Sequence, residues 1–452
     1  MTQSKWIFLA VLITSFIGPF MGSSINIAIP SMAKEFQLPV EQLSWVVTAY
    51  LLGSASALLP FGKLADIIGR KRLYRIGIVA IIITTIGSGL APSMDVLVLF
   101  RLLQGVSLAM IFSTGMAILV SSHKPEERGK VIGYSSAAVY IGLSLGPVIG
   151  GMITQYFGWR LIFFLTAAGL VLSFAAVSKV SDEWYGDKQE KLDYFGSLLY
   201  CAASSMVLYG LSAYAEHPMV KYIFFGGVVL FGIFLLEQSR VSNPLLEMGL
   251  FHNTIFTMSN LAAMIHYSST FALGFLLSLY LQLIRGFDAS TAGLFLLLQP
   301  SMMALFSPKA GALSDRLQPR FVATSGMAMT AIGLAAFSFL TAVSPIWQIA
   351  VNLLFIGIGF AFFSSPNSNA IMGAVEPRQY GVAASVLSVM RLGGQAISMA
   401  IVTVLLSVYT VDAMSPEYLP SLLAAFHKIF EVLAVSCVLG VAASLARGKR
   451  KI

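Results

Sequence analysis

The sequence of 452 residues is short of charged residues and cysteines, and each shortage excludes a class of protein. Only 11% of the residues are charged, whereas 57% are hydrophobic and the mean hydropathy is +0.83. A soluble protein of this length carries roughly a quarter charged residues. Since hydrocarbon tolerates few charges, this composition is typical of a chain embedded in a lipid bilayer.

Motifs for metals and nucleotides are also missing. The two cysteines, Cys201 and Cys437, form no CxxC pair, and the five histidines form no HExxH pattern. No GxxxxGK[ST] phosphate loop occurs. We therefore expect no metal site, no cofactor and no ATP-hydrolysing step.

The net charge of +8 does not indicate a nucleic-acid partner, because of where the charge lies. Lys and Arg stand in short segments between apolar runs and do not follow one helix face. If the N-terminus is inside, most of the 28 Lys and Arg residues fall on inner segments. This bias predicts a multi-pass protein of the inner or plasma membrane with both termini in the cytoplasm. Trp45, Trp159 and Trp347 fall at the expected outer ends, as an interfacial aromatic belt requires.

Apolar runs long enough to cross the hydrocarbon predict fourteen helical spans. About twenty residues are needed, since a helix rises 1.5 Å per residue. The first run follows Lys5 without a small-residue cleavage pattern, so we expect a retained span and not a signal peptide. The expected spans are 6–30, 44–62, 73–91, 96–121, 130–156, 159–180, 194–215, 219–238, 254–284, 290–313, 320–341, 346–372, 379–408 and 421–446. The fold class is an all-α polytopic membrane protein.

An internal repeat divides the chain. Gly62-Lys-Leu-Ala-Asp66 follows the second span, and Gly311-Ala-Leu-Ser-Asp315-Arg316 follows the second span of the later half. The two longest inner loops flank spans seven and eight. We therefore predict a six-helix bundle at 1–180, a two-helix insert at 181–253 and a second six-helix bundle at 254–452. Parallel repeats of this kind place the substrate site between the halves, near the midplane.

Five short motifs carry a family resemblance that extends over essentially the whole chain. They are Gly62 to Arg72 after span two, Arg101-Leu-Leu-Gln104-Gly105, Gly142-Leu-Ser-Leu-Gly146-Pro147-Val-Ile-Gly150-Gly151, Trp45-Val-Val-Thr48-Ala49-Tyr50 and Arg391-Leu-Gly393-Gly394. In these motifs the chain resembles the fourteen-helix drug:proton antiporters of the major facilitator superfamily. The resemblance implies a major facilitator fold and proton-coupled efflux of amphipathic drugs or other small molecules by alternating access.

Two of the motifs are expected to act in the conformational change. The resemblance implies that the loop after span two latches the cytoplasmic side when the transporter faces outward. The alternative is a plain positive-inside anchor. The expected gating residues are Gly62, Asp66, Gly69, Arg70, Asp315 and Arg316.

The second of these motifs lies in span five. Gly142, Gly146 and Gly150 recur every four residues, which lets another helix backbone approach closely. Pro147 removes a backbone hydrogen bond and should bend the span. A closely packed face that can slide is what a rocking interface needs.

Two arginines fall inside spans, where a charge is costly unless it faces water or a partner. Arg101 lies about five residues into its span. The resemblance favours a cavity-facing role for it, with Gln104 on the same face, and the alternative is snorkelling to the interface. Arg391 lies roughly 18 Å into its span, close to the midplane. We expect it to line the cavity.

The chain departs from the family pattern at Met21, where the resembling transporters carry an acidic residue. A purely cationic drug is therefore a less favoured substrate, and the proton carrier is left open. His266 is a candidate because it titrates near neutral pH; the alternative is a neutral histidine bonded between helices. Asn26, Gln299 and Gln395 add uncharged polar groups to the expected pathway.

The expected partners are a small-molecule substrate, protons and the lipid bilayer, with no nucleic acid, and a monomer is expected. The competing hypothesis is an uptake facilitator or symporter for a small nutrient on the same fold. An enzyme is not expected, because no nucleophile–base constellation and no soluble domain is present.

Overall fold

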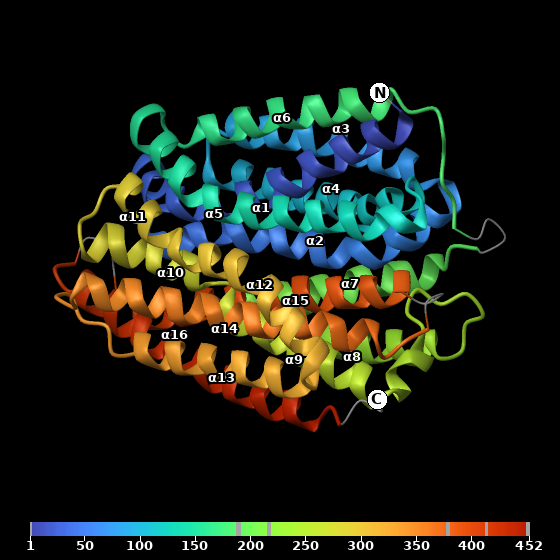
Figure 1. Ribbon diagram of the computed structural model, residues 1–452. Coiled ribbons are helices and arrows are strands. Elements are labelled where there is room, and N and C mark those ends of the chain that lie inside the picture. Colours follow the sequence, from blue (N-terminus) through green and yellow to red (C-terminus); the bar gives the residue numbers. More distant parts are fainter. Residues whose placement is uncertain (1, 187–190, 215–217, 377–379, 412–414, 449–452) are drawn as a thin grey trace.

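The computed structural model is built from helices that run nearly side by side (Figure 1). It describes residues 2–186, 191–214, 218–376, 380–411 and 415–448, and only the backbone at 40, 41, 125–130, 136, 315, 380 and 381. Within these ranges there is no β-strand, and fourteen helical segments are long and apolar enough to cross a membrane. The predicted fold class is confirmed.

Six helices form the first half of the molecule, in the upper part of Figure 1. The tightest pairs are α1 with α5, α2 with α4, and α3 with both α4 and α6. Their bounds are α1 Gln3–Phe36, α2 Val40–Ile68, α3 Arg70–Gly89, α4 Met94–Ser121, α5 Pro125–Phe157 and α6 Arg160–Ser178.

The next two helices, α7 (Tyr194–Ser212) and α8 (Val220–Gln238), pair with each other. Of the two, α7 contacts α2 and α15, one helix from each half. A 3-10 turn at Met248–His252 follows. The division of the chain into two bundles and an insert stays a prediction.

The second half lies in the lower part of Figure 1. Its strongest pairings join α13 with α14, α12 with α14, and α9 with α15. The elements are α9 Thr254–Thr270, α10 Leu273–Leu279, the π-helix η2 Tyr280–Ile284, α11 Ala289–Leu296, α12 Leu298–Arg316, α13 Pro319–Phe337, α14 Ile346–Met372, α15 Tyr380–Tyr409 and α16 Tyr418–Ala446.

One expected span of the second half is interrupted in the structure. The span at 254–284 breaks after Thr270, where the Ala272 amide donates to Ser398 Oγ at 3.1 Å, and it ends in a π-helix, a local widening that is frequent at functional sites. The span at 290–313 stays helical through Leu297, whose amide donates to the Gly293 carbonyl and whose carbonyl accepts from the Ser301 amide, both at 3.1 Å. Pro300, three residues on, removes one N–H from that hydrogen-bond ladder.

The loop expected after span two is shorter than the sequence indicates. Helix α2 continues to Ile68, so Gly62 and Asp66 lie in its last two turns and not in a loop. The reversal into α3 is made at Gly69, whose φ of +108° is one that residues with a Cβ rarely adopt.

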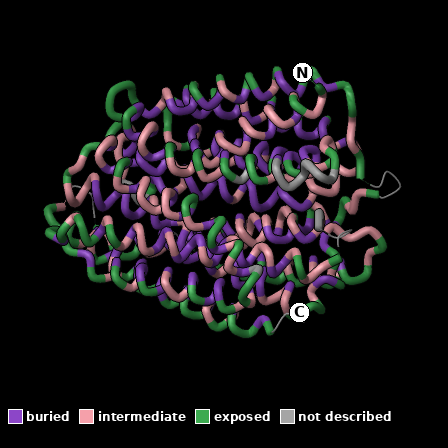
Figure 2. The backbone as a smooth tube through the Cα atoms, in the orientation of Figure 1, coloured by how far each residue is buried: buried purple, intermediate pink, exposed green. Residues whose placement is uncertain are grey.

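Large apolar side chains face outward from many helices, as a bilayer requires. Figure 2 shows buried backbone concentrated in the interior and exposed residues on the periphery and at the helix ends. Exposed side chains that would contact lipid include Ile83, Leu172, Leu198, Ile332 and Leu439. We call the end where α1 begins and α16 ends the terminal end, and the opposite end, where α1 ends at Phe36 and α2 begins, the far end (Figure 1).

Candidate substrate chamber and its polar networks

An aromatic cluster lies where the two halves meet. Tyr267 of α9, Met303 of α12 and Phe360 of α14 are buried together, and Tyr140 of α5 packs against them from the first half. The ring centroids of Tyr267 and Phe360 are 5.5 Å apart at 80°, a T-shaped contact. The cluster gives the junction between the halves an aromatic, polarisable lining.

Arg391 of α15 lies over this cluster. Its guanidinium carbon is 5.1 Å from the centroid of the Tyr267 ring, a cation–π contact. The side chain is half-buried, and its Nε has no hydrogen-bond partner within the described part of the chain. Arg391 therefore presents an unpaired donor beside an aromatic surface. Gln395, one turn further along α15, is also half-buried.

His266 is next to Tyr267 in sequence but faces a different side of α9. It is fully buried, its ring stacks on Phe363 at 4.0 Å, and its Nε2 is 3.5 Å from Thr330 Oγ1. Its Nδ1 has no partner among the described residues. Phe360 contacts both His266, at 4.9 Å, and Tyr267. The imidazole is thus one ring away from the surface that Arg391 borders.

Arg101 belongs to a separate network inside the first half. Its side chain is 1% exposed, its Nε donates to the Val46 carbonyl at 2.9 Å, and its guanidinium carbon lies 4.2 Å from the Tyr50 ring centroid. Its Nη1 donates to Gln104 Oε1. Backbone, amide and ring thus surround the buried cation, which offsets part of the cost of removing it from water.

Gln104 connects this network to α1 and α3. Its Nε2 donates to Thr85 Oγ1 at 2.6 Å and contacts the Met21 sulfur at 3.3 Å. The position at which the resembling transporters carry an acid therefore adjoins the Arg101 network. Met21 fills it with an uncharged thioether.

The predicted pathway residues fall into separate groups. Arg391, Gln395 and His266 lie around the aromatic cluster, whereas Arg101 and Gln104 are enclosed among α1 to α4. Gln299, half-buried near the start of α12, has its carbonyl against Gly357 of α14. Asn26 lies at the junction of the halves nearer the far end, where its carbonyl accepts a 2.7 Å hydrogen bond from Ser278 Oγ of α10.

Sequence reasoning missed the members of the aromatic cluster. Tyr140, Tyr267 and Phe360 are three of many aromatics in a chain that is 12% aromatic, so their type alone carries no signal. The sequence offered one signal, because Tyr267 directly follows His266, which was a candidate site residue. The structure adds that α15 packs against α9, which brings Arg391 to the Tyr267 ring.

The halves are joined at the far end by small and polar contacts. Gln282 Nε2 donates to the Ile27 carbonyl at 3.0 Å, and the hydroxyls of Ser44 (α2) and Thr403 (α15) are 2.9 Å apart. Together with the Asn26–Ser278 bond, these contacts bring α1 and α2 against α10, η2 and α15. Within the described residues, the two halves are therefore in direct contact at the far end.

Helix α5 packs tightly on two sides in this region. Gly142, Gly146 and Gly150 lie against α1, where a Cβ would overlap the backbone or Ser23 and Ser24, and Ser24 Oγ donates to the Gly146 carbonyl at 2.9 Å. On another side, the Pro147 carbonyl lies against Gly293 of α11, and Gly151 against the Ala289 carbonyl. The motif therefore forms part of the contact between the halves.

The expected gating cluster is held at the terminal end within the first half. Asp66 pairs with Arg70 at 2.7 Å, and its carbonyl accepts from the Gly186 amide at 3.0 Å. The Arg70 amide donates to the Trp184 carbonyl at 2.7 Å. These contacts bind the α2–α3 turn to the segment that follows α6.

The remaining gating residues are placed as follows. Gly62 faces Ser113 of α4 at ordinary van der Waals distance. In the second half, Arg316 is exposed at the end of α12, and the side chain of Asp315 lies outside the described residues.

Apolar helices in two groups, with a charged and aromatic interior, define a multi-pass membrane transporter. Residues 11–253 and 259–448 match the family model of the Major Facilitator Superfamily. The chain belongs to this superfamily, whose members are transporters and not enzymes.

Individual relatives agree with this assignment. The chain is 32% identical over 397 residues to the riboflavin transporter RibZ of Clostridioides difficile (strain 630), covering 86% of this chain and 85% of that protein. It is 29% identical over 423 residues to the multidrug resistance protein Stp of Mycobacterium tuberculosis (strain CDC 1551 / Oshkosh), covering 90% and 78%.

Among solved structures, a bacterial homolog of the human lysosomal transporter Spinster, in an inward-facing, unoccupied conformation, superimposes with a TM-score of 0.73. The identity is 15%, with 99% of this chain and 97% of that chain covered. At this identity the likeness establishes the fold.

The Arg101 network yields a test of stability. Replacing Gln104 by Leu removes the amide that bonds Arg101 and Thr85 and leaves a buried cation short of an acceptor. We expect a loss of about 2 kcal/mol or more, since hydrogen bonds to charged groups contribute about 1.5–3 kcal/mol. The measurement is thermal unfolding in detergent. Ser113→Ala, which removes a hydroxyl bonded within its own helix, is the control; equal effects of both variants would contradict the assignment.

Proposed function

We propose that this protein is a secondary active transporter that exports amphipathic small molecules by alternating access, driven by proton entry. We place it in the plasma membrane with both termini in the cytoplasm, which makes the terminal end cytoplasmic. The observation that carries the proposal is the aromatic cluster at the junction of the halves, with the unpaired donor of Arg391 above it.

The chemistry of this chamber favours flat, amphipathic substrates. The rings of Tyr140, Tyr267 and Phe360 offer faces for stacking, and Met303 is soft enough to adapt to different shapes. Arg391 would attract a carbonyl, phenolate or carboxylate oxygen. Since Met21 stands where resembling transporters carry an acid, the first half offers no carboxylate there for a cation. We therefore infer neutral or anionic ring compounds as the substrate class.

Alternating access follows from the contacts at the far end. Closure there, with the terminal end cytoplasmic, corresponds to an inward-facing state. The far-end contacts are few hydrogen bonds and close glycine packing, which rocking of 1–180 against 254–452 would separate. In the outward-facing state, Asp66 and Arg70 would form the latch toward the second half.

Proton coupling rests on His266 in this proposal. The imidazole is a side chain that suits proton transfer near neutral pH and adjoins the aromatic cluster, and its Nδ1 is unpaired within the described structure. In the described state it has no exposed surface. A proton would therefore reach it only when the rings around it move, which would link protonation to the conformational change.

A second candidate, uptake of a nutrient on the same fold, is favoured by the similarity to a riboflavin transporter. The multidrug resistance relative and the glycine–proline motif of α5 favour export. The two functions differ in the direction in which protons and substrate move.

Purified protein in liposomes, with riboflavin as the neutral probe and ethidium as a cationic comparison, tests the proposal. With an acidic lumen, an antiporter accumulates riboflavin inside, whereas a proton symporter accumulates it when the exterior is acidic. We expect accumulation with the acidic lumen, weaker transport of ethidium, and loss of accumulation but retained downhill flux in His266→Gln. Riboflavin flux that is independent of the gradient would rule out proton coupling.

Arg391 offers a test of the chamber. Arg391→Ala should slow riboflavin transport at least about tenfold while the protein stays folded, because the side chain forms no hydrogen bond at Nε that its loss would break. Arg391→Lys keeps the charge but loses the planar fork, so an intermediate rate is expected. The measurements are flux in liposomes and melting temperature in detergent; a wild-type rate from the alanine variant would remove Arg391 from the chamber.

The far-end contact between Ser44 and Thr403 offers a test of alternating access. Because their hydroxyls are 2.9 Å apart, Ser44→Cys with Thr403→Cys should form a disulfide under mild oxidation. That bond should arrest transport, and reduction should restore it. Each single variant treated in the same way is the control. Full transport by the oxidised double variant would mean that the far end does not open.

A further inference from the structure

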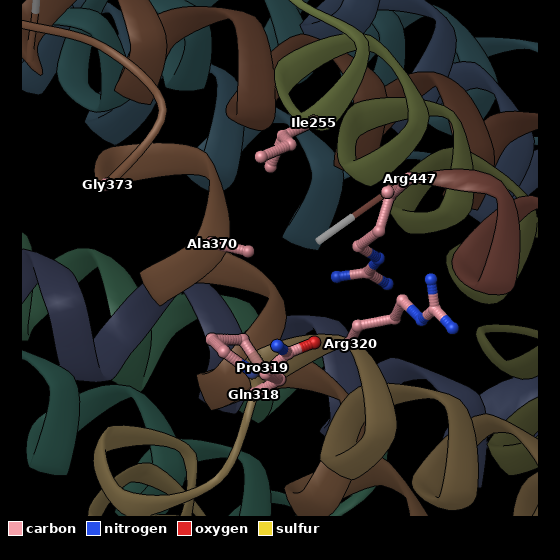
Figure 3. Close-up of a pocket in the computed structure, with 8 residues that line it drawn as sticks. Ile255, Gln318, Pro319, Arg320, Ala370, Gly373 and Arg447 are labelled. Carbon is pink, nitrogen blue, oxygen red and sulfur yellow. The ribbon is translucent and has the colours of Figure 1, made fainter. Parts of the chain in front are cut away.

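A small pocket at the terminal end of the second half is lined by two arginines. It lies between the start of α13 and the ends of α14 and α16, with Ile255 of α9 on one side. Figure 3 shows the side chains of Arg320 and Arg447 directed into the same space, with Gln318 beside them. The pocket encloses about 20 Å³ and is partly open to the surface.

Arg447 is buried and only partly satisfied. It is 1% exposed; its Nε donates to the Ser444 carbonyl at 2.9 Å, and its Nη2 donates to the Ser444 hydroxyl. That hydroxyl is in turn 2.8 Å from Thr324 Oγ1 of α13. These bonds fix the guanidinium, but Nη1 has no partner within the described residues. A buried, unpaired donor on a cation is costly unless a ligand completes it.

Arg320 adds a second cation that is only partly satisfied. Its side chain is half-buried, its guanidinium carbon lies 5.0 Å from the centroid of the Phe321 ring, and its Nε lacks a hydrogen-bond partner in the described structure. Burial and the neighbouring charge of Arg320 lower the pKa of Arg447 to about 10. None of the described residues that line the pocket is acidic. Two like charges therefore share a confined space in which no carboxylate among those residues balances them.

The start of α13 reinforces the positive potential. Gln318 stands at its N-cap without a side-chain hydrogen bond to the helix. Pro319 has no N–H, and the Phe321 amide donates to the Gln318 carbonyl at 3.0 Å, so the helix contributes mainly the positive end of its dipole. Helix N-termini bind phosphate and carboxylate groups on this basis. Here the helix end acts together with Nη1 of the buried Arg447, which has no partner among the described residues.

We propose that this pocket binds a phosphate group that bridges Arg320 and Arg447. The enclosed space admits about one oxygen atom, since a single water needs roughly 10–15 Å³. One phosphate oxygen would enter between the guanidinium groups while the rest of the group projects through the open side. This arrangement suits a phosphate ester, from a lipid headgroup or from a soluble phosphate. The anion would tie the ends of α13 and α16 together.

The proposal is tested on the full-length, delipidated protein by melting temperature in detergent. The additions are inorganic phosphate, a short-chain phosphatidylglycerol, a short-chain phosphatidylcholine and chloride at matched ionic strength. A ligand that binds the folded state raises its stability with concentration. We expect stabilisation by phosphate, by phosphatidylglycerol or by both, beyond the effect of the other two additions.

The variants Arg320→Gln and Arg447→Gln should weaken this response at least about tenfold in apparent affinity. Arg240→Gln, at an exposed arginine after α8, should leave it unchanged. A response to phosphatidylglycerol alone assigns the site to lipid, and a response to inorganic phosphate assigns it to soluble phosphate. An unresponsive wild type, or an Arg320→Gln variant that responds like wild type, overturns the proposal. If Arg447→Gln does not fold, the change in melting temperature of the Arg320→Gln variant with added ligand is the test of the proposal.

Discussion

The contact of α5 with α1 on one side and α11 on the other is the constraint on which the arrangement of the halves depends. In a bilayer no hydrophobic force draws two apolar helices together, so they associate by close packing and by hydrogen bonds. Glycine at 142, 146 and 150 lets α5 approach α1, and Gly293 lets α11 approach the Pro147 carbonyl. The contact of α5 with α1 holds the first half together, whereas the contact of α5 with α11 joins the halves. The second contact depends on shape and contains little buried charge, so it can separate and re-form without a large desolvation cost.

The charged interior is organised differently in the two halves. In the first half, Arg101 is enclosed by a backbone carbonyl, an amide and an aromatic ring, which is a structural solution to burying a cation. In the second half, Nε of Arg391 has no hydrogen-bond partner among the described residues and lies beside aromatic faces. Arg101 thus has its partners within the protein, whereas Arg391 keeps a donor available for a ligand. The difference explains why we place substrate recognition at Arg391.

The sequence predicted the helical framework closely, because lipid fixes both the length and the apolarity of each span. The span at 346–372 has the bounds that were predicted for it. Hydropathy could not reveal the break after Thr270, since an interrupted span is as apolar as a continuous one. The hydropathy pattern also predicted too early an end for α2, because the polar turn before Ile68 remains helical in the structure. The partners of Met21, Gln104 and Tyr267 come from distant segments, and no local pattern encodes them.

The interruption in the first span of the second half has a mechanical consequence. An unbroken helix transmits a tilt along its whole length, whereas a break confines bending to one joint. Helix α10 has seven residues and lies between such a joint and the far end. We expect it to move as a short lever while α9 stays packed against α15, so that the far end loosens by local bending before the halves separate.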